Sequence, residues 1–245
     1  RQELAELSKG TSTRSAKRTT NELANVALVG YTNAGKSTLM NRLLARFGVG
    51  ADTDDTKQVF EKDMLFATLT TTVRQLTLPD KKQFLLSDTV GFVSKLPHNL
   101  VSAFKSTLQE AANADLLLQI VDVSDEHYKD MMATTEKTLA EVGVTDVPMI
   151  TVYNKADRTE LVYPDVSGEN TITISALDPA SQDALIDLIK KQIFNDVQEV
   201  TLHIPFDQGA VQAKLAAKHT FSKEDYDETG TLITVELSEL ERKLY

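Results

Sequence analysis

The sequence predicts an α/β fold with a mostly parallel six-stranded sheet in which one strand is antiparallel, followed by a small α+β domain. Up to Phe194, apolar runs of strand length alternate with helical patterns, and this alternation is typical of a parallel sheet with helices on both faces. After Asp196 the alternation gives way to a strand, a helix and a hairpin. The expected domains are therefore 22–196 and 197–245, preceded by the segment 1–21.

The larger domain begins with an apolar run that predicts a buried strand, and a segment of helical spacing follows it after a glycine-containing loop. A tight turn at 78–82 joins the next two strands, so the strand before the turn should run antiparallel to the strand after it. Further on, a helix is expected to bury a stripe that comprises Met131, Met132, Thr135, Leu139 and Val142. The boundaries expected from the pattern are 25–29, 38–44, 83–87, 125–142, 147–153 and 171–174.

The smaller domain has a different order of patterns. A strand is expected at 199–205 and a helix at 208–218, and a hairpin is expected to pair 221–226 with 231–237. The residues of this domain do not indicate what it does.

The most informative motif lies between the first strand and the first helix. Residues 30–37 read Gly-Tyr-Thr-Asn-Ala-Gly-Lys-Ser and match the phosphate-binding pattern GxxxxGK[ST]. Glycines let backbone N–H groups close around phosphate oxygens at a helix N-terminus, where the helix dipole favours anions. Lys36 would reach the β- and γ-phosphates, and the Ser37 hydroxyl would bind magnesium. A glycine turn with a chance lysine is the alternative, but the strand, loop and helix in register favour a P-loop NTPase.

A second motif indicates which base is bound. Asn154-Lys-Ala-Asp157 follows an apolar strand and matches NKxD. The carboxylate of Asp157 can accept hydrogen bonds from N1 and N2 of guanine, and adenine lacks both donors. Asn154 would tie this loop to the phosphate loop, and the stem of Lys155 would lie on the base. Taken alone, NKAD could be a polar loop after any strand. The upstream phosphate loop and the downstream backbone of 175–177, which would contact guanine O6, favour guanine recognition.

The third motif is Asp88-Thr-Val-Gly91, which closes an apolar strand and matches DxxG. Asp88 would hold magnesium through water, and the Gly91 amide would sense the γ-phosphate. DxxG recurs by chance in many chains, so its position between the other two motifs is what makes it informative. The long polar stretch at 48–63 is the natural first switch of such a protein. Together these motifs predict a GTPase G domain.

Several stretches resemble the HflX family of ribosome-associated GTPases, which is related to Obg. They are Gly-Tyr-Thr-Asn-Ala-Gly-Lys-Ser-Thr-Leu (30–39), Leu-Phe-Ala-Thr-Leu (65–69), Asp-Thr-Val-Gly-Phe-Val (88–93), Leu-Pro-His-Asn-Leu-Val-Ser-Ala-Phe-Lys-Ser-Thr-Leu-Gln-Glu (96–110) and Ala-Asp-Leu-Leu-Leu (114–118). The resemblance is strong over 22–191 and weaker after Val200. It implies a further N-terminal domain joined by a helical linker, of which 1–21 would be the end, so the chain is expected to be a fragment.

The resemblance also implies a role for the first switch. Thr68 would supply the second protein oxygen to magnesium, although Thr70, Thr71 and Thr72 lie beside it and stay open as alternatives. The family has Asp-Pro where this chain has Thr70-Thr71, so the proline that would fix φ is absent here.

The predicted site residues fall into three groups. The expected nucleotide contacts are Gly30, Tyr31, Thr32, Asn33, Ala34, Gly35, Lys36, Ser37, Thr38, Phe66, Ala67, Thr68, Leu69, Thr70, Asp88, Thr89, Val90, Gly91, Asn154, Lys155, Ala156, Asp157, Ser175, Ala176 and Leu177. The expected magnesium ligands are Ser37, Thr68 and Asp88. The residues expected to act in catalysis are Lys36, Thr68, Gly91 and Asn33.

The sequence shows no residue of the usual kind for orienting the attacking water. Phe92 follows Gly91 where many GTPases have glutamine, and a phenyl ring cannot make the needed hydrogen bond. Asn33 matches an asparagine that, in related GTPases, helps hold a potassium ion in the role of an arginine finger. Capping of the loop is an equally good interpretation of Asn33. GTP or GDP, Mg²⁺ and K⁺ are thus the expected cofactors.

Composition bounds the remaining possibilities. The 245 residues, 41% of them hydrophobic, suffice for one G domain with small flanks. A net charge of −10 argues against a general RNA-binding surface, whereas the basic segment 1–20 could contact RNA or be an exposed linker. The absence of cysteine excludes disulfides and thiol chemistry. Without a signal peptide or a long apolar span, we expect a cytoplasmic protein without a membrane span. We also expect the protein to be a monomer.

Three functions compete at this point. The first is a GTPase that associates with the large ribosomal subunit, mainly through the N-terminal domain, and acts in splitting, rescue or recycling of ribosomes. The second is a GTP-dependent binding switch for a protein partner without ribosome action. The third is an ATP-using P-loop enzyme such as a kinase, against which the NKxD motif argues.

Overall fold

The computed structural model describes residues 23–48, 72–88 and 111–245, which form a seven-stranded and a three-stranded sheet. The larger sheet has the order β2-β3-β1-β4-β5-β7-β6. Its strands are β1 (Ala24–Val29), β2 (Thr72–Thr77), β3 (Gln83–Asp88), β4 (Leu116–Asp122), β5 (Met149–Asn154), β6 (Asp165–Val166) and β7 (Thr171–Thr173). Its helices are α2 (Lys36–Phe47), α4 (Tyr128–Glu141), the short η1 (Ala156–Arg158) and α5 (Pro179–Ile193).

The predicted fold class is confirmed. The pairs β1–β3, β1–β4, β4–β5 and β5–β7 are parallel, and β2 is antiparallel to β3 as the tight turn between them predicts. The sheet has one strand more than the six expected from the sequence, because β6 pairs antiparallel with β7 at the edge. β6 has two residues, too few to show a strand periodicity.

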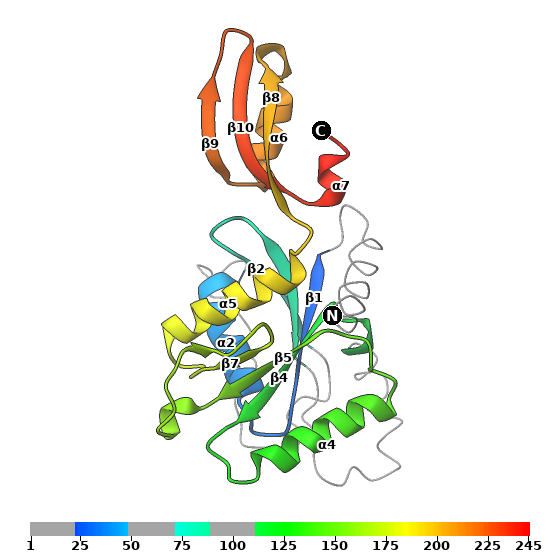
Figure 1. Cartoon of the computed structure of the whole chain (residues 1–245), viewed down its shortest axis with the longest axis vertical. Helices are drawn as coiled ribbons and strands as arrows, with labels where there is room; N and C mark the ends of the chain where they lie inside the picture. Colours follow the sequence, from blue (N-terminus) through cyan, green and yellow to red (C-terminus); the bar gives the residue numbers. More distant parts are fainter. Residues whose placement is uncertain (1–22, 49–71, 89–110) are drawn as a thin grey trace.

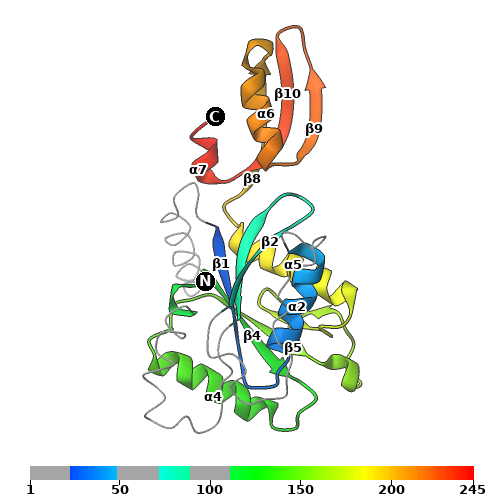
Figure 2. The ribbon, with the colours of Figure 1, turned by 180° about the vertical axis from the view of Figure 1, so that it is seen from behind.

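Helices cover both faces of the larger sheet, as Figures 1 and 2 show. Successive residues of a strand point to opposite faces. In β1, Val26 and Leu28 therefore pack with α2 and α5, whereas Ala27 and Val29 pack in a second cluster with Leu139 of α4. Burial on both faces explains why the central strands read as continuous apolar runs.

The three-stranded sheet carries the smaller hydrophobic core. It consists of β8 (Gln198–Pro205), β10 (Gly230–Leu237) and β9 (Phe221–Tyr226), in that order and all antiparallel. The remaining elements are η2 (Phe206–Gln208), α6 (Gly209–Lys218) and α7 (Glu239–Arg242). Leu215 of α6 packs on Ile204, Ile233, Val235 and Leu237 of the sheet. The three strands and α6 lie within one residue of those expected from the sequence, whereas η2 and α7 were not expected.

The three-stranded sheet with η2, α6 and α7 (residues 198–242) forms a smaller unit. Two lysines of the turn between β2 and β3 contact this smaller unit. Lys81 Nζ donates hydrogen bonds to the carbonyl oxygens of Ala216 (2.5 Å) and His219 (3.2 Å) at the C-terminal end of α6. Lys82 Nζ lies 2.5 Å from a carboxylate oxygen of Glu236 in β10. A cation at a helix C-terminus is favoured by the helix dipole.

Within the described residues, no helix combines the length and apolarity needed to cross a membrane.

The last helical turn is fixed by Glu241. Its carboxylate accepts hydrogen bonds from the backbone N–H and the hydroxyl of Ser238, at 3.0 and 2.7 Å, and lies 3.1 Å from His219 Nε2. Burial alone would raise the pKa of Glu241, but the hydrogen bonds from His219 and Ser238 lower it to about 2. The charged carboxylate is therefore the form that stabilises this part of the fold.

We expect Glu241→Gln to lower the free energy of unfolding at pH 7 by about 1–2 kcal/mol, a figure reduced for solvent screening. A carboxylate with a lowered folded-state pKa contributes fully above its unfolded pKa of about 4.3 and loses the contribution as pH falls toward the folded value. The difference between wild type and variant should therefore shrink between about pH 4.5 and 2. Urea unfolding followed by circular dichroism would measure it.

Glu228→Gln provides the control, because it removes an exposed carboxylate from the same unit and should change stability by less than about 0.5 kcal/mol. A difference between wild type and Glu241→Gln that stays constant with pH would contradict this account.

Candidate functional site

The predicted motifs meet at one edge of the larger sheet. β1, β3, β4 and β5 are parallel, and the strand register pairs Leu28 with Asp88 and Asp122 with Asn154. The carboxyl ends of these strands therefore lie side by side. The phosphate loop, the start of DxxG and the NKxD loop follow three of them, at the edge where α/β sheets bind their ligands.

Two glycines permit the tight path of the phosphate loop, residues 30–37. Gly30 has φ of 144° and Gly35, just before α2, has φ of 97°. A Cβ atom at Gly30 would lie 2.3 Å from the carbonyl oxygen of Ile120, and one at Gly35 would lie 2.4 Å from Asn154 Nδ2. Both positions exclude a side chain. The close packing directs the backbone N–H groups of the loop and of the first turn of α2 toward the mouth of the loop.

Lys36 is held inside this loop. Its side chain is 7% exposed, and its Nζ donates hydrogen bonds to the carbonyl oxygens of Gly30 (2.9 Å) and Tyr31 (2.8 Å). Burial lowers the pKa of Lys36 to about 8, while the charge of Asp88 opposes that shift. A phosphate anion beside the ammonium would favour its charged form further.

The two described magnesium-ligand candidates are in direct contact. Ser37 Oγ donates a hydrogen bond to Asp88 Oδ2 over 2.9 Å. A hydroxyl and a carboxylate oxygen brought together beside a phosphate loop are the donor types that Mg²⁺ prefers. The donor types of this pair therefore fit a magnesium ion, which Ser37 and Asp88 would help to hold.

The buried amide of Asn154 joins three loops. Its Nδ2 donates to the carbonyl oxygen of Ala34 (2.9 Å), and its Oδ1 accepts the backbone N–H of Ala176 (3.0 Å). Asn154 is 2% exposed, so both hydrogen bonds are shielded from water. The NKxD loop is thereby linked to the phosphate loop on one side and to the 175–177 loop on the other.

Lys155 makes a second link to the phosphate loop. Its backbone is left-handed, with φ of 63°, which costs about 1–2 kcal/mol for a residue with a Cβ atom. Its Nζ donates to the carbonyl oxygen of Asn33 and to Asp122 Oδ2, both over 2.7 Å. Burial raises the pKa of Asp122, but hydrogen bonds from Lys155 and Ser124 outweigh it and hold the pKa below its usual value.

Sequence reasoning missed Asp122. The available signal was its position as the last residue of the buried strand β4, at the same edge as the other motifs. By contrast, Asp157 was predicted, and the structure places it in η1 with an exposed side chain. Ser175 and Ala176 are buried, whereas Leu177 is 56% exposed. Asp157 and Leu177 thus lie on the solvent side of their loops.

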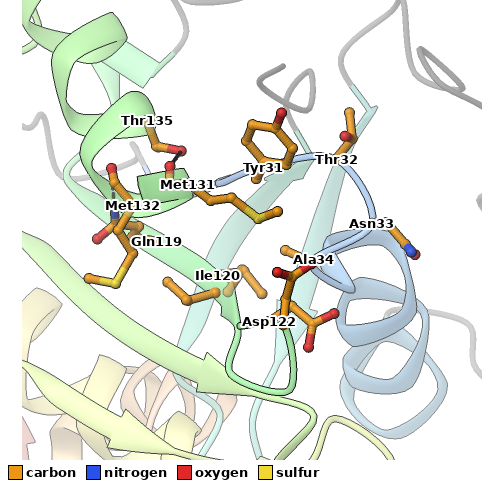
Figure 3. Close-up of a pocket in the computed structure, with 12 residues that line it drawn as sticks. Tyr31, Thr32, Asn33, Ala34, Gln119, Ile120, Asp122, Met131, Met132 and Thr135 are labelled. Atoms are coloured by element: carbon orange, nitrogen blue, oxygen red, sulfur yellow. Dashed lines mark hydrogen bonds between the residues drawn. The ribbon is translucent and has the colours of Figure 1, made fainter. Parts of the chain in front are cut away.

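A cavity of about 70 Å³ adjoins the phosphate loop on its α4 side. Figure 3 shows Tyr31 and Asn33 of the loop, Gln119 of β4, and Met131, Met132 and Thr135 of α4 around it. Gln119 Nε2 donates to the carbonyl oxygen of Met132 over 3.4 Å. The helix stripe predicted to be core is therefore only partly core: Thr135 and Leu139 are buried, whereas Met131 and Met132 are half-buried in the cavity wall.

Some predicted site residues lie outside the described part of the chain. They are Phe66, Ala67, Thr68, Leu69, Thr70, Thr89, Val90 and Gly91. Their assignment stays a prediction from the sequence.

A phosphate loop, an aspartate at the start of DxxG and an NKxD loop at one edge of this sheet define the G domain of a P-loop GTPase. Residues 25–155 match the protein family described as 50S ribosome-binding GTPase. Guanine nucleotides are the ligands of this class.

Relatives at higher identity define the family further. The chain is 40% identical to GTPase HflX of Caldanaerobacter subterraneus over 238 residues, which are 97% of this chain and 52% of that protein. It is 33% identical to GTPase HflX of Escherichia coli over 216 residues, which are 86% of this chain and 48% of that protein. The chain belongs to the HflX family of GTPases, and residues 25–155 lie in its GTPase domain. It spans about half the length of these relatives.

Solved structures agree on the fold. A GTP-binding protein from the archaeon Sulfolobus solfataricus in complex with GDP superposes with a TM-score of 0.52 at 24% identity, over 70% of this chain and 53% of that chain. At this identity the likeness concerns the fold alone.

We expect Gly35→Ala to weaken guanine nucleotide binding by about tenfold or more. The new Cβ would collide with Asn154 Nδ2, and relief of the collision would displace the phosphate loop. Titration with a fluorescent GDP analogue would measure the affinity.

Gly143→Ala is the matched control, since Gly143 also has a positive φ, of 83°, but has no atom within 4 Å of the added Cβ. The positive φ should cost Gly143→Ala about 1 kcal/mol of stability, and Gly35→Ala should lose more because of the added collision. Equal nucleotide affinity in the two variants would show that the close approach to Asn154 does not matter.

Proposed function

We propose that this chain is the GTP-binding and GTP-hydrolysing part of a factor that associates with the large ribosomal subunit and acts in splitting, rescue or recycling of ribosomes. The observation that carries the nucleotide assignment is the convergence of Lys36, the Ser37–Asp88 pair and Asn154 at one sheet edge. The ribosome assignment is supported by the description of the matching family. The relatives are about twice as long as this chain. The family resemblance implies an N-terminal domain, and we propose that ribosome contact depends mainly on that domain.

The proposed mechanism assigns phosphate binding to the phosphate loop. Backbone N–H groups at the start of α2 bind phosphate oxygens, and Lys36 moves its ammonium from the loop carbonyls to the β- and γ-phosphates. Ser37, Asp88 and Thr68 would hold magnesium, and a bound magnesium ion would supply positive charge beside the phosphates. The Gly91 amide would contact the γ-phosphate, so the segment that follows Gly91 would respond to the presence of GTP.

Base recognition is assigned to the NKxD loop and its neighbours. Asp157 would accept hydrogen bonds from guanine N1 and N2, and the 175–177 backbone would bind O6. Asn154 positions both loops through its two buried hydrogen bonds. This arrangement disfavours an ATP-using enzyme, because adenine would leave the Asp157 carboxylate unpaired.

A second function is a GTP-dependent binding switch for a protein partner. It shares all of the nucleotide chemistry, so the G domain alone does not separate it from the ribosome factor. Cytoplasmic location, a monomeric state and K⁺ binding at Asn33 stay predictions from the sequence.

We expect Asp157→Asn to weaken GTP binding by at least about tenfold and to favour xanthosine nucleotides. Xanthine has a carbonyl where guanine has its 2-amino group, so it can accept a hydrogen bond from the new amide. Competition between GTP and XTP for both proteins would measure the change. Unchanged GTP affinity in the variant would contradict the assignment of guanine recognition to Asp157.

We expect the full-length protein to sediment with large ribosomal subunits in a GTP analogue more than in GDP. We also expect its turnover, on the order of 10⁻⁴ to 10⁻² s⁻¹ when unassisted, to rise on subunit addition. The lack of a glutamine after Gly91 is the reason to expect slow unassisted hydrolysis. Absence of sedimentation in either state favours the protein-partner switch.

Turnover measured in potassium and in sodium at equal ionic strength tests whether Asn33 helps hold K⁺. If Asn33 helps hold K⁺, potassium should raise turnover of the wild type and not of Asn33→Ala. A potassium effect of equal size in both proteins would leave Asn33 with a capping role.

A further inference from the structure

The end of β4 supplies a carboxylate that belongs to none of the nucleotide motifs. Asp122 Oδ2 lies 2.7 Å from Lys155 Nζ, and the two side chains are 17% and 14% exposed. The other oxygen, Oδ1, accepts the hydroxyl of Ser124 at 2.5 Å and its backbone N–H at 3.1 Å. Ser124, in the turn after β4, thus orients the Asp122 carboxylate, and the second carboxylate oxygen binds Lys155.

Lys155 is held at both ends. Its backbone follows Asn154, which pairs with Asp122 in the strand register and is fixed by two buried hydrogen bonds. Its ammonium is bound between Asp122 and the carbonyl oxygen of Asn33 in the phosphate loop. A four-carbon stem fixed at both ends retains few rotamers. The aliphatic stem of Lys155 is therefore already ordered before a nucleotide binds.

We propose that Asp122 is a positioning residue for guanine nucleotide binding, which holds Lys155 against the phosphate loop so that the lysine stem is in place before the base arrives. This inference rests on the proposed function, because it takes Lys155 as the residue that lies on the base. Its physical basis is preorganisation: ordering a lysine during binding would cost affinity that an already ordered lysine does not cost.

The geometry distinguishes this pair from an ordinary surface ion pair. Exposed pairs contribute little because water screens them and their side chains must be ordered. Here both partners are more than four-fifths shielded and each has a second hydrogen bond. The second hydrogen bond of Lys155 also links the NKxD loop to the phosphate loop, and both loops would contact the nucleotide. The same contacts are compatible with a pair that only stabilises the sheet edge, so the test has to separate the two roles.

The experiment measures GDP and IDP affinity and GDP release for wild type, Asp122→Asn, Lys155→Met and the double variant. We expect Asp122→Asn to weaken GDP binding by about tenfold, mainly through faster release. IDP lacks the 2-amino group but presents a similar ring face. The ratio of GDP to IDP affinity should therefore stay unchanged in Asp122→Asn, whereas Asp157→Asn should change it.

The double variant decides the mechanism. If Asp122 acts through Lys155, adding Asp122→Asn to Lys155→Met should change GDP affinity by less than about twofold. Independent, multiplying effects would overturn the proposal, as would wild-type affinity in Asp122→Asn. Should the amide retain the lysine hydrogen bond, Asp122→Ala removes it and faces the same criteria.

Asp125→Asn is the matched control, since it removes a carboxylate from the same loop whose oxygen caps the backbone N–H of His127 instead. It should bind GDP like the wild type. A comparable loss in this control would mean that loop charge, not the Lys155 contact, sets affinity, and would also overturn the proposal. Failure of the wild type to bind guanine nucleotides at all would instead refute the proposed function, and this inference would fall with it.

Discussion

The arrangement of the candidate site depends on the buried amide of Asn154. One side chain holds the phosphate loop through the carbonyl oxygen of Ala34 and the 175–177 loop through the N–H of Ala176. An amide has both a donor and an acceptor, so it can join a carbonyl to an N–H, which a carboxylate or an ammonium cannot do alone. The close approach that these bonds require also explains why residue 35 has no side chain. The phosphate loop and the loops proposed to bind the base are therefore held by one local geometry.

That geometry is possible because the central strands are buried on both faces. β1 sends Val26 and Leu28 into the core under α2 and α5, and Ala27 and Val29 into the core beside α4. A strand fixed from both sides cannot shift its register without exposing a whole face. The polar residues at the strand ends, Asp88 and Asn154, can then be buried at fixed positions, where their hydrogen bonds are shielded from water.

Sequence patterns could predict the sheet and the motif-bearing loops, because strand periodicity and glycine spacing are local properties. They could not predict contacts between segments far apart in the chain. Asp122 looked like the end of an apolar strand, and its role depends on Lys155, which reaches it only through the β4–β5 register. β6 was missed because two residues carry no period, and its pairing with β7 depends on the path of the chain between them. The half-buried Met131 and Met132 show the same limit, since a helical stripe does not reveal whether the opposing surface is filled.

The position of the smaller unit follows from the direction of the parallel strands. Lys81 and Lys82, which contact that unit, lie in the turn before β3 and therefore at the amino edge of the parallel strands. Asp88 ends β3 at the carboxyl edge, roughly 20 Å away for a strand of six residues. Figure 1 shows the three-stranded sheet beyond one end of the larger sheet and the loop between β1 and α2 at the other end. These contacts therefore keep the smaller unit away from the candidate nucleotide site. Among the described residues, the β2–β3 hairpin is a direct physical link between the two, because its turn contacts the smaller unit and its second strand ends at Asp88.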